Sequence, residues 1–174
     1  MKNYIFLLCI LLFLSSCKSH IQSQKKNNLY QNIVEAYIEY RNSEGELDKK
    51  ENILIFGANE SENTKNAYWV DIAFVNPRLL SDFQYKKVYE IKGYKLIIDE
   101  SLNKSNELKN SFHEVEYENF NLAKESIDYN LKNWHITFNS KQEIIRISPQ
   151  QKSKEIRDLM VKKGAKFSQD FDDL

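Results

Sequence analysis

The sequence predicts an α+β domain in which an antiparallel sheet of about five to seven strands is flanked by an N-terminal and a C-terminal helix. Two observations support this fold class. Apolar residues recur with helical spacing near both ends of the polar body of the chain, over residues 29–42 and 149–163. Between these segments, short strand-like stretches follow one another without a long helical pattern. Strands in unbroken succession favour an antiparallel sheet over parallel βαβ crossovers.

Both helices have recognisable ends. The first is predicted over Leu29–Asn42, with Asn28 as its N-cap. Its apolar residues share one helical face: Leu29, Ile33, Ala36, Tyr37 and Tyr40. The second is predicted over Pro149–Lys163, capped by Ser148 and stopped by Gly164. Its inner face carries Ile156, Leu159 and Met160.

Two apolar segments predict the first strands. Asn52–Phe56 is short and is expected to end at Gly57, so that residues 58–66 form a polar connection. Ala67–Val75 has Tyr68, Val70, Ile72 and Phe74 on one face and Trp69, Asp71, Ala73 and Val75 on the other. Because both faces are mostly apolar, this segment is predicted to be a central strand.

Residues 85–99 predict a β-hairpin with Lys92 and Gly93 as its two-residue turn. This turn pairs Ile91 with Tyr94, Glu90 with Lys95, Tyr89 with Leu96, Val88 with Ile97 and Lys86 with Asp99. Two of the pairs join opposite charges and three are apolar, each worth roughly 0.2–1 kcal/mol. Lysine is not the favoured first turn residue, which is Asn or Asp. One long strand kinked at Gly93 is the alternative.

The second half of the chain continues the strand pattern. Ser101–Asn110 is polar and predicts a loop or a loose helix, and His113–Glu118 predicts a strand. Leu131–Asn139 alternates, with Trp134, Ile136 and Phe138 directed inward and Asn133, His135, Thr137 and Asn139 outward. A turn at residues 139–141 leads to a last strand over residues 142–148.

The N-terminus opens with an uncharged stretch of eleven residues, Tyr4–Leu14, behind Lys2. This length suits the apolar region of a signal peptide and is too short to span a bilayer, which takes roughly 20 apolar residues. A buried N-terminal core helix is the alternative. The position at the extreme terminus, the preceding lysine and the small residues that follow favour the signal peptide.

The stretch ends in Leu14-Ser15-Ser16-Cys17, which resembles the lipobox of bacterial lipoproteins. The resemblance implies lipid transfer to the Cys17 thiol, cleavage before Cys17 and acylation, by palmitate for example, of the new amino group. Two or more lipid chains anchor a protein stably. Residues 1–16 are then a cleaved signal peptide, residues 17–28 the lipidated cysteine and a flexible tether, and residues 29–174 a single globular domain.

The residues after Cys17 bear on localisation. Lys18, rather than Asp, follows the cysteine. By resemblance to the sorting rule of enterobacterial lipoproteins, this implies the outer membrane. No acidic cluster follows Cys17, which favours an orientation towards the periplasm over the cell surface.

Composition limits the chemistry of the mature chain. Cys9 leaves with the signal peptide and Cys17 carries lipid, so no thiol remains for a disulfide, a metal or a nucleophile. Removal of residues 1–16 takes one of the 25 basic residues and none of the 25 acidic ones, which leaves a net charge of −1. The charges are interspersed without a basic stripe, so no nucleic-acid partner is expected. The sequence has no GxSxG, glycine-rich phosphate loop or CxxC, and no cofactor is expected.

The segment HEVEYE, residues 113–118, is the most conspicuous cluster of reactive side chains. Extended, it places Glu114, Glu116 and Glu118 on one face, about 6.6–7 Å apart, where a hard cation such as Ca²⁺ would need further loop ligands. A charged edge strand explains the same pattern. His113 and His135 lack the HExxH spacing of zinc sites. We therefore expect no metal ligand and assign no catalytic residue.

These features favour a non-catalytic lipoprotein of the cell envelope that binds a protein partner, in an immunity or envelope-assembly role. The aromatic residues of Ala67–Val75 and of the Tyr85–Tyr94 hairpin are the predicted contact surface. The alternative is a periplasmic hydrolase that uses His113 or His135 with nearby carboxylates. It requires the histidines to converge with Glu114 or Glu116 in a cleft.

Overall fold

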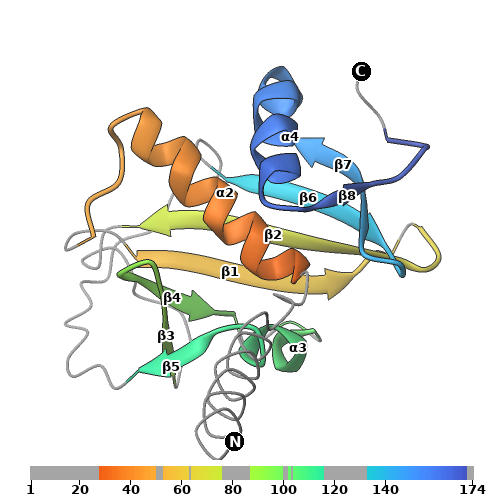
Figure 1. The fold of residues 1–174 in the computed structure, drawn as a ribbon. Helices are drawn as coiled ribbons and strands as arrows, with labels where there is room; N and C mark the ends of the chain where they lie inside the picture. Colours follow the sequence, from red (N-terminus) through yellow and green to blue (C-terminus); the bar gives the residue numbers. More distant parts are fainter. Residues whose placement is uncertain are drawn as a thin grey trace, which may run out of the picture.

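The computed structural model describes residues 28–49, 53–62, 64–75, 87–99, 102, 104–115 and 133–171. In this part of the chain, eight strands form one sheet in the order β5-β3-β4-β1-β2-β6-β7-β8. The strands are β1 (Ile53–Glu60), β2 (Ala67–Val75), β3 (Val88–Ile91), β4 (Tyr94–Ile98), β5 (His113–Val115), β6 (Trp134–Asn139), β7 (Glu143–Ser148) and β8 (Lys166–Phe167). The α-helices are α2 (Leu29–Ser43), α3 (Ser105–Lys109) and α4 (Ser153–Lys162). The α+β class is as predicted (Figure 1).

The sheet is mixed, so the prediction of a purely antiparallel sheet of five to seven strands was wrong. β1 runs parallel to β4, and β7 runs parallel to β8. The second parallel pair is possible because α4 connects the end of β7 to the start of β8, so that both strands run in the same direction. Parallel neighbours require a crossover connection of this kind. β8 has only two residues, too few to leave a pattern in the sequence.

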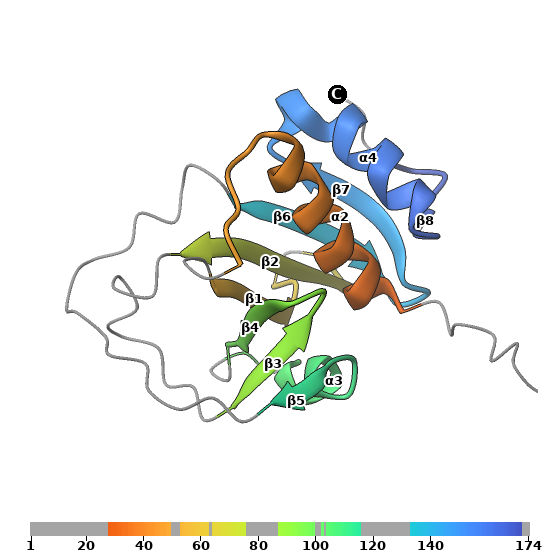
Figure 2. The same ribbon diagram turned by 60° about the vertical axis from the view of Figure 1, so that its left-hand side comes forward.

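Helices α2 and α4 lie side by side on one face of the sheet, rather than one on each side (Figures 1 and 2). The predicted first helix is confirmed: Asn28 Oδ1 accepts hydrogen bonds from the backbone N–H groups of Tyr30 and Gln31, at 3.1 and 3.3 Å. α2 buries Ile33 and Tyr37 against the sheet. There the Tyr37 ring meets Trp134, which is 2 % exposed, edge-on at 5.1 Å between centroids.

The C-terminal helix begins later than predicted. Pro149 is extended and residues 150–152 form a 3-10 turn, so α4 begins at Ser153. Ile156 and Met160 are fully buried, whereas Leu159 is partly buried. Gly164 follows the helix with φ +90°, a conformation that confirms its predicted role as the stop signal.

The first strand is longer than predicted. β1 continues through Gly57, and its polar end pairs with β2, Asn59 opposite Trp69 and Glu60 opposite Tyr68. The glycine therefore does not end the strand. A Cβ at this position would lie 2.5 Å from Leu102 Cδ1, so the end of the Leu102 side chain would have to move to admit one.

The predicted hairpin is confirmed in its register, and the kinked single strand is wrong. Four of the predicted pairs are observed between β3 and β4, from Val88–Ile97 to Ile91–Tyr94. Lys92 and Gly93 both have positive φ, 52° and 80°, as a type I′ turn requires. The fifth pair includes Lys86, outside the described residues.

Strands β6 and β7 complete the core. Trp134, Ile136 and Phe138 are buried as predicted. A bulge opposite Thr137 and Phe138 allows Ile144 and Ile147, three positions apart, both to face the core. The long-range pairings β1·β4 and β2·β6 flank the β1–β2 hairpin on its two sides.

The last turn of α2 contains a buried charged residue, Arg41. Arg41, whose side chain is 7 % exposed, lies 2.9 Å from Glu44 and 2.6 Å from Glu46 through Nη1. Its guanidinium lies over the rings of Tyr37, Tyr40 and Phe74, at 5.5 to 5.8 Å from their centroids. Burial raises the pKa of Tyr37 to about 12.

Among the described residues, no helix combines the length and the apolar composition needed to cross a bilayer. The predicted signal peptide, Cys17 and the tether up to residue 27 lie outside the described residues.

Candidate functional site

The candidate site lies on the face of the sheet opposite α2 and α4. Side chains alternate along a strand, so the residues between the core positions point to this second face. They are Ile55 and Gly57 on β1, Trp69, Asp71 and Ala73 on β2, and His135 and Thr137 on β6. The pattern is apolar near β1 and becomes polar towards β6 and β7, where Arg146 and Ser148 are exposed.

A three-residue cluster occupies the middle of this face. Asp71 pairs with His135 across β2 and β6, and the Nδ1 atom of His135 lies 2.7 Å from Asp71 Oδ1. The imidazole also stacks on the indole of Trp69, with centroids 5.5 Å apart and an interplanar angle of 30°. The side chains of Asp71 and His135 remain 48 % and 45 % exposed. Asp71 and Trp69 therefore hold the imidazole in one orientation at an accessible surface.

The cluster borders three hollows in the surface, and His135 lines all of them. A hollow of about 640 Å³ lies over β1 and β2 and includes Trp69 and Asp71. Another of about 410 Å³ lies between His135 and the chain after β7, and includes Ser148. The third, about 740 Å³, extends from Thr137 past Arg146 towards Phe171. These volumes fall within the range typical of ligand sites.

Ser148 extends the row of polar groups across a third strand. It pairs with His135 in the β6–β7 register, so Asp71, His135 and Ser148 follow one another across β2, β6 and β7. No hydrogen bond joins Ser148 to His135 among the described contacts. The arrangement provides an oriented imidazole with a hydroxyl nearby, without a formed nucleophile–base pair.

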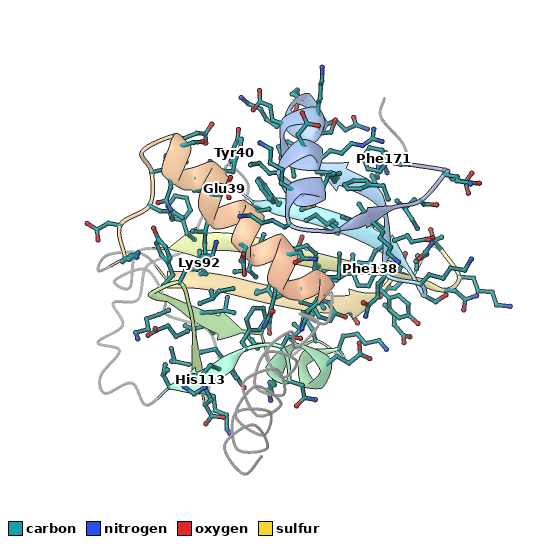
Figure 3. All side chains as sticks on the ribbon, in the orientation of Figure 1. Glu39, Tyr40, Lys92, His113, Phe138 and Phe171 are labelled. Carbon is teal, nitrogen blue, oxygen red and sulfur yellow. The ribbon has the colours of Figure 1, made fainter. Side chains whose placement is uncertain are left out.

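The two histidines considered from the sequence do not converge. His113 lies on β5, at the outer edge of the sheet (Figure 3), and the strand order places it five strand spacings from His135, about 24 Å. His135 lines a hollow with Asp71 as its carboxylate, whereas Glu114 lies on β5 with His113. The convergence of the two histidines that the hydrolase alternative required is therefore not observed, whereas His135 by itself lines a hollow and stays a candidate.

The described part of the HEVEYE segment forms an edge strand. Residues 113–115 pair with β3 as β5, and Glu114 makes an exposed ion pair with Lys87 at 2.7 Å. Glu116 and Glu118 lie outside the described residues. Within the described ranges, no group of three or more His, Cys, Asp and Glu side chains is placed to hold a metal ion.

Two tyrosines of the aromatic contact surface predicted from the sequence belong to the core instead, and Tyr85 lies outside the described residues. Tyr89 and Tyr94 of the hairpin are each 3 % exposed and belong to the core, so they offer no contact area. Trp69 is partly exposed on the second face. The Asp71–His135 pair was not predicted, because its residues are 64 positions apart and only the β2–β6 pairing brings them together.

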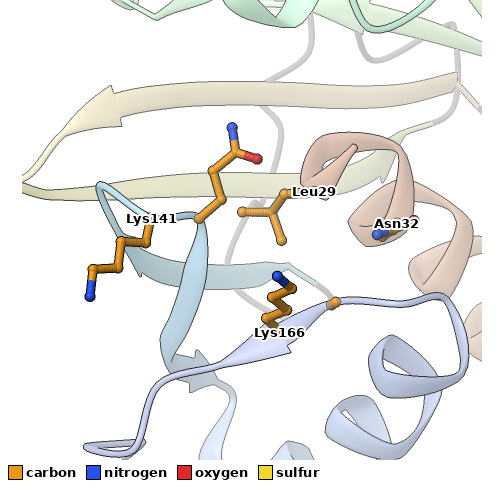
Figure 4. A pocket seen from close by; sticks show the side chains of 6 residues that line it. Leu29, Asn32, Lys141 and Lys166 are labelled. Carbon is orange, nitrogen blue, oxygen red and sulfur yellow. The ribbon is translucent and has the colours of Figure 1, made fainter. Parts of the chain in front are cut away.

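A smaller hollow of about 120 Å³ lies at the beginning of α2 (Figure 4). Leu29 and Asn32 of α2 line it together with Lys141 and Gln142 of the β6–β7 turn and Ala165 and Lys166 near β8. It holds little more than a few water molecules, so we regard the larger face around His135 as the candidate site.

Comparison with protein-family models, with curated proteins and with solved structures finds no match for this chain.

Proposed function

We propose that this protein is a lipoprotein of the bacterial envelope, anchored through Cys17, and that its domain binds a protein partner without catalysis. Attachment to the outer membrane on the periplasmic side and an immunity or envelope-assembly role belong to the same proposal. The lipobox-like residues Leu14-Ser15-Ser16-Cys17 support the anchor. The fold supports the binding role through the second face of the sheet, which neither α2 nor α4 covers.

The observation that carries the proposal is the partly exposed Trp69, held by its stack on His135. Tryptophan and arginine are enriched among the residues that contribute most to binding at protein interfaces, and Arg146 lies on the same face. A ring already fixed by a neighbour loses little conformational freedom when a partner covers it. The surface is therefore suited to contact with another folded surface or an extended segment.

Thiol cross-linking in the intact envelope tests the proposal. The processed chain would carry no free thiol, so Thr137→Cys introduces a single one at the centre of the face. Asp158→Cys places the control thiol on the exposed side of α4, on the opposite side of the sheet. We expect a bismaleimide to give a defined adduct only from Thr137→Cys. No adduct from this variant, or equal yields from both, would refute the proposed surface.

The Asp71–His135 pair also favours the second candidate, a periplasmic hydrolase with His135 as general base. Asp71 would orient the imidazole through Nδ1, which leaves Nε2 to accept a proton from water or from Ser148. A panel of ester, amide and phosphoester substrates tests it with His135→Gln as the comparison. Turnover that is lost in His135→Gln would support hydrolysis, and turnover equal in both proteins would exclude His135.

A further inference from the structure

The hollow over β1 and β2 contains a feature that the proposed contact surface does not use. It is lined by Trp69, Asp71 and Asp99, with Gly57 and Leu102 between the two aspartates. Its volume of about 640 Å³ is large enough for an amino-acid side chain together with part of the backbone that carries it.

The strand register places the two carboxylates on opposite sides of Gly57. Asp71 is the β2 residue opposite Gly57. On the other side, the backbone N–H of Asp99 donates to the Phe56 carbonyl, and Asp99 Cβ lies 3.4 Å from where a Gly57 Cβ would be. Two strand spacings separate Asp71 from Asp99, about 10 Å. The part of the hollow between these two acidic residues forms a notch, in which the Leu102 side chain fills the space that a side chain at Gly57 would take.

The floor of this notch is apolar. Leu102 Cδ1 occupies the space above Gly57, and Ile55 and Ala73 are buried nearby on the same face. The side chain of Trp69 lines the hollow beside Asp71. The notch thus has an apolar base, with carboxylates and an indole around its opening. This arrangement is complementary to a side chain that has an aliphatic stem and a cationic head.

The charges of the lining agree with this. Among the described residues that line the hollow, two are aspartates and none is lysine or arginine. The imidazole of His135 is turned towards Asp71 through Nδ1. One Asp71 oxygen accepts that hydrogen bond and the carboxylate has a second oxygen for another donor.

We propose that this notch receives a lysine or arginine side chain of the protein partner, with its stem on Leu102 and its head between Trp69, Asp71 and Asp99. The inference rests on the proposed function and specifies the chemistry of the partner. A neutral apolar side chain would gain only the contact with the apolar residues at the base of the notch, and an acidic side chain would be repelled by two like charges. The notch therefore selects cationic residues.

NMR spectroscopy of the two indole N–H groups tests the inference on the mature protein. Trp134 is buried in the core, so its signal reports folding, while the Trp69 signal reports the notch. The probe is N-acetyl-lysine amide, and N-acetyl-norleucine amide is the matched probe with the same stem and no charge. We expect a saturable shift of the Trp69 signal at millimolar lysine probe, and binding about fivefold or more weaker for the norleucine probe.

Asp71→Asn should weaken binding of the lysine probe by a similar factor, while the Trp134 signal keeps its position. Asp158→Asn is the control and should leave binding of the probe unchanged. Equal binding of the two probes, or unchanged binding in Asp71→Asn, would overturn the inference. Cross-linking at Thr137 without any binding of the lysine probe would refute the notch alone. Binding of the lysine probe without cross-linking would instead refute the protein partner.

Discussion

The strongest stability prediction concerns Arg41, whose guanidinium is buried between two carboxylates and three aromatic rings. Replacement by alanine removes the partner of Glu44 and Glu46 and leaves space beneath the rings of Tyr37 and Phe74. Removal of one partner of a fully buried ion pair costs about 3–5 kcal/mol. The two glutamates are 33 % and 26 % exposed, so water will solvate them again and reduce this cost.

We therefore expect Arg41→Ala to lower the free energy of unfolding by about 3 kcal/mol, a value that combines the lost contacts with the lost packing. Arg41→Lys keeps the charge but loses the planar group that reaches both carboxylates and stacks on the rings. About half of the loss should therefore persist in this variant.

Urea unfolding at neutral pH measures both variants, followed by the signal of the buried Trp134. Lys154→Ala, on the exposed surface of α4, is the control and should change stability by less than about 0.5 kcal/mol. If Arg41→Lys is as stable as the wild type, a positive charge alone is sufficient, and the two-carboxylate geometry does not contribute. If Arg41→Ala is as stable as the control, the buried guanidinium does not stabilise the fold.

Three further predictions concern pH, the hairpin and the anchor. Burial raises the pKa of Tyr37 from 10.0 to about 12, so between these pH values the unfolded chain loses the phenol proton while the folded protein keeps it. The free energy of unfolding should therefore fall by about 2–3 kcal/mol as the pH rises from about 10 to 12. Urea unfolding across this range should show a smaller fall in Tyr37→Phe. Lys92→Asn should stabilise the protein by less than about 1 kcal/mol in thermal melting, because Asn suits the turn, while loss of the 3.2 Å contact with Glu35, whose side chain is only 16 % exposed, offsets part of the gain; a lower melting temperature would contradict this. Cys17→Ala should abolish metabolic labelling with palmitate and leave the precursor uncleaved; mature membrane-bound protein from this variant would refute the lipobox.

The sequence was informative where the structure depends on neighbours along the chain. The bounds of Ala67–Val75, the cap at Asn28 and the hairpin register all follow from local patterns, and the structure agrees with each. Local patterns do not say which strands become neighbours, so the parallel β1·β4 pair was not predicted. For the same reason Asp71, on the second face of its strand, and His135, on the outward face of its own, were not predicted to meet. The end of β1 was predicted too early because residues 58–60 are mostly polar, although their backbone pairs with β2 regardless of the side chains.

The two long-range pairings on either side of the β1–β2 hairpin have a consequence for the order of folding. Ile53 pairs with Lys95, 42 residues later, and Val70 pairs with Ile136, 66 residues later. The hairpins β1–β2, β3–β4 and β6–β7 close over short distances and form quickly, whereas joining them requires the closure of long loops. Until that happens, the apolar β1–β2 hairpin has unpaired hydrogen-bonding groups along both edges, which are prone to pair with other chains. A newly made chain is therefore most exposed to aggregation at the strands that later form the centre of its sheet.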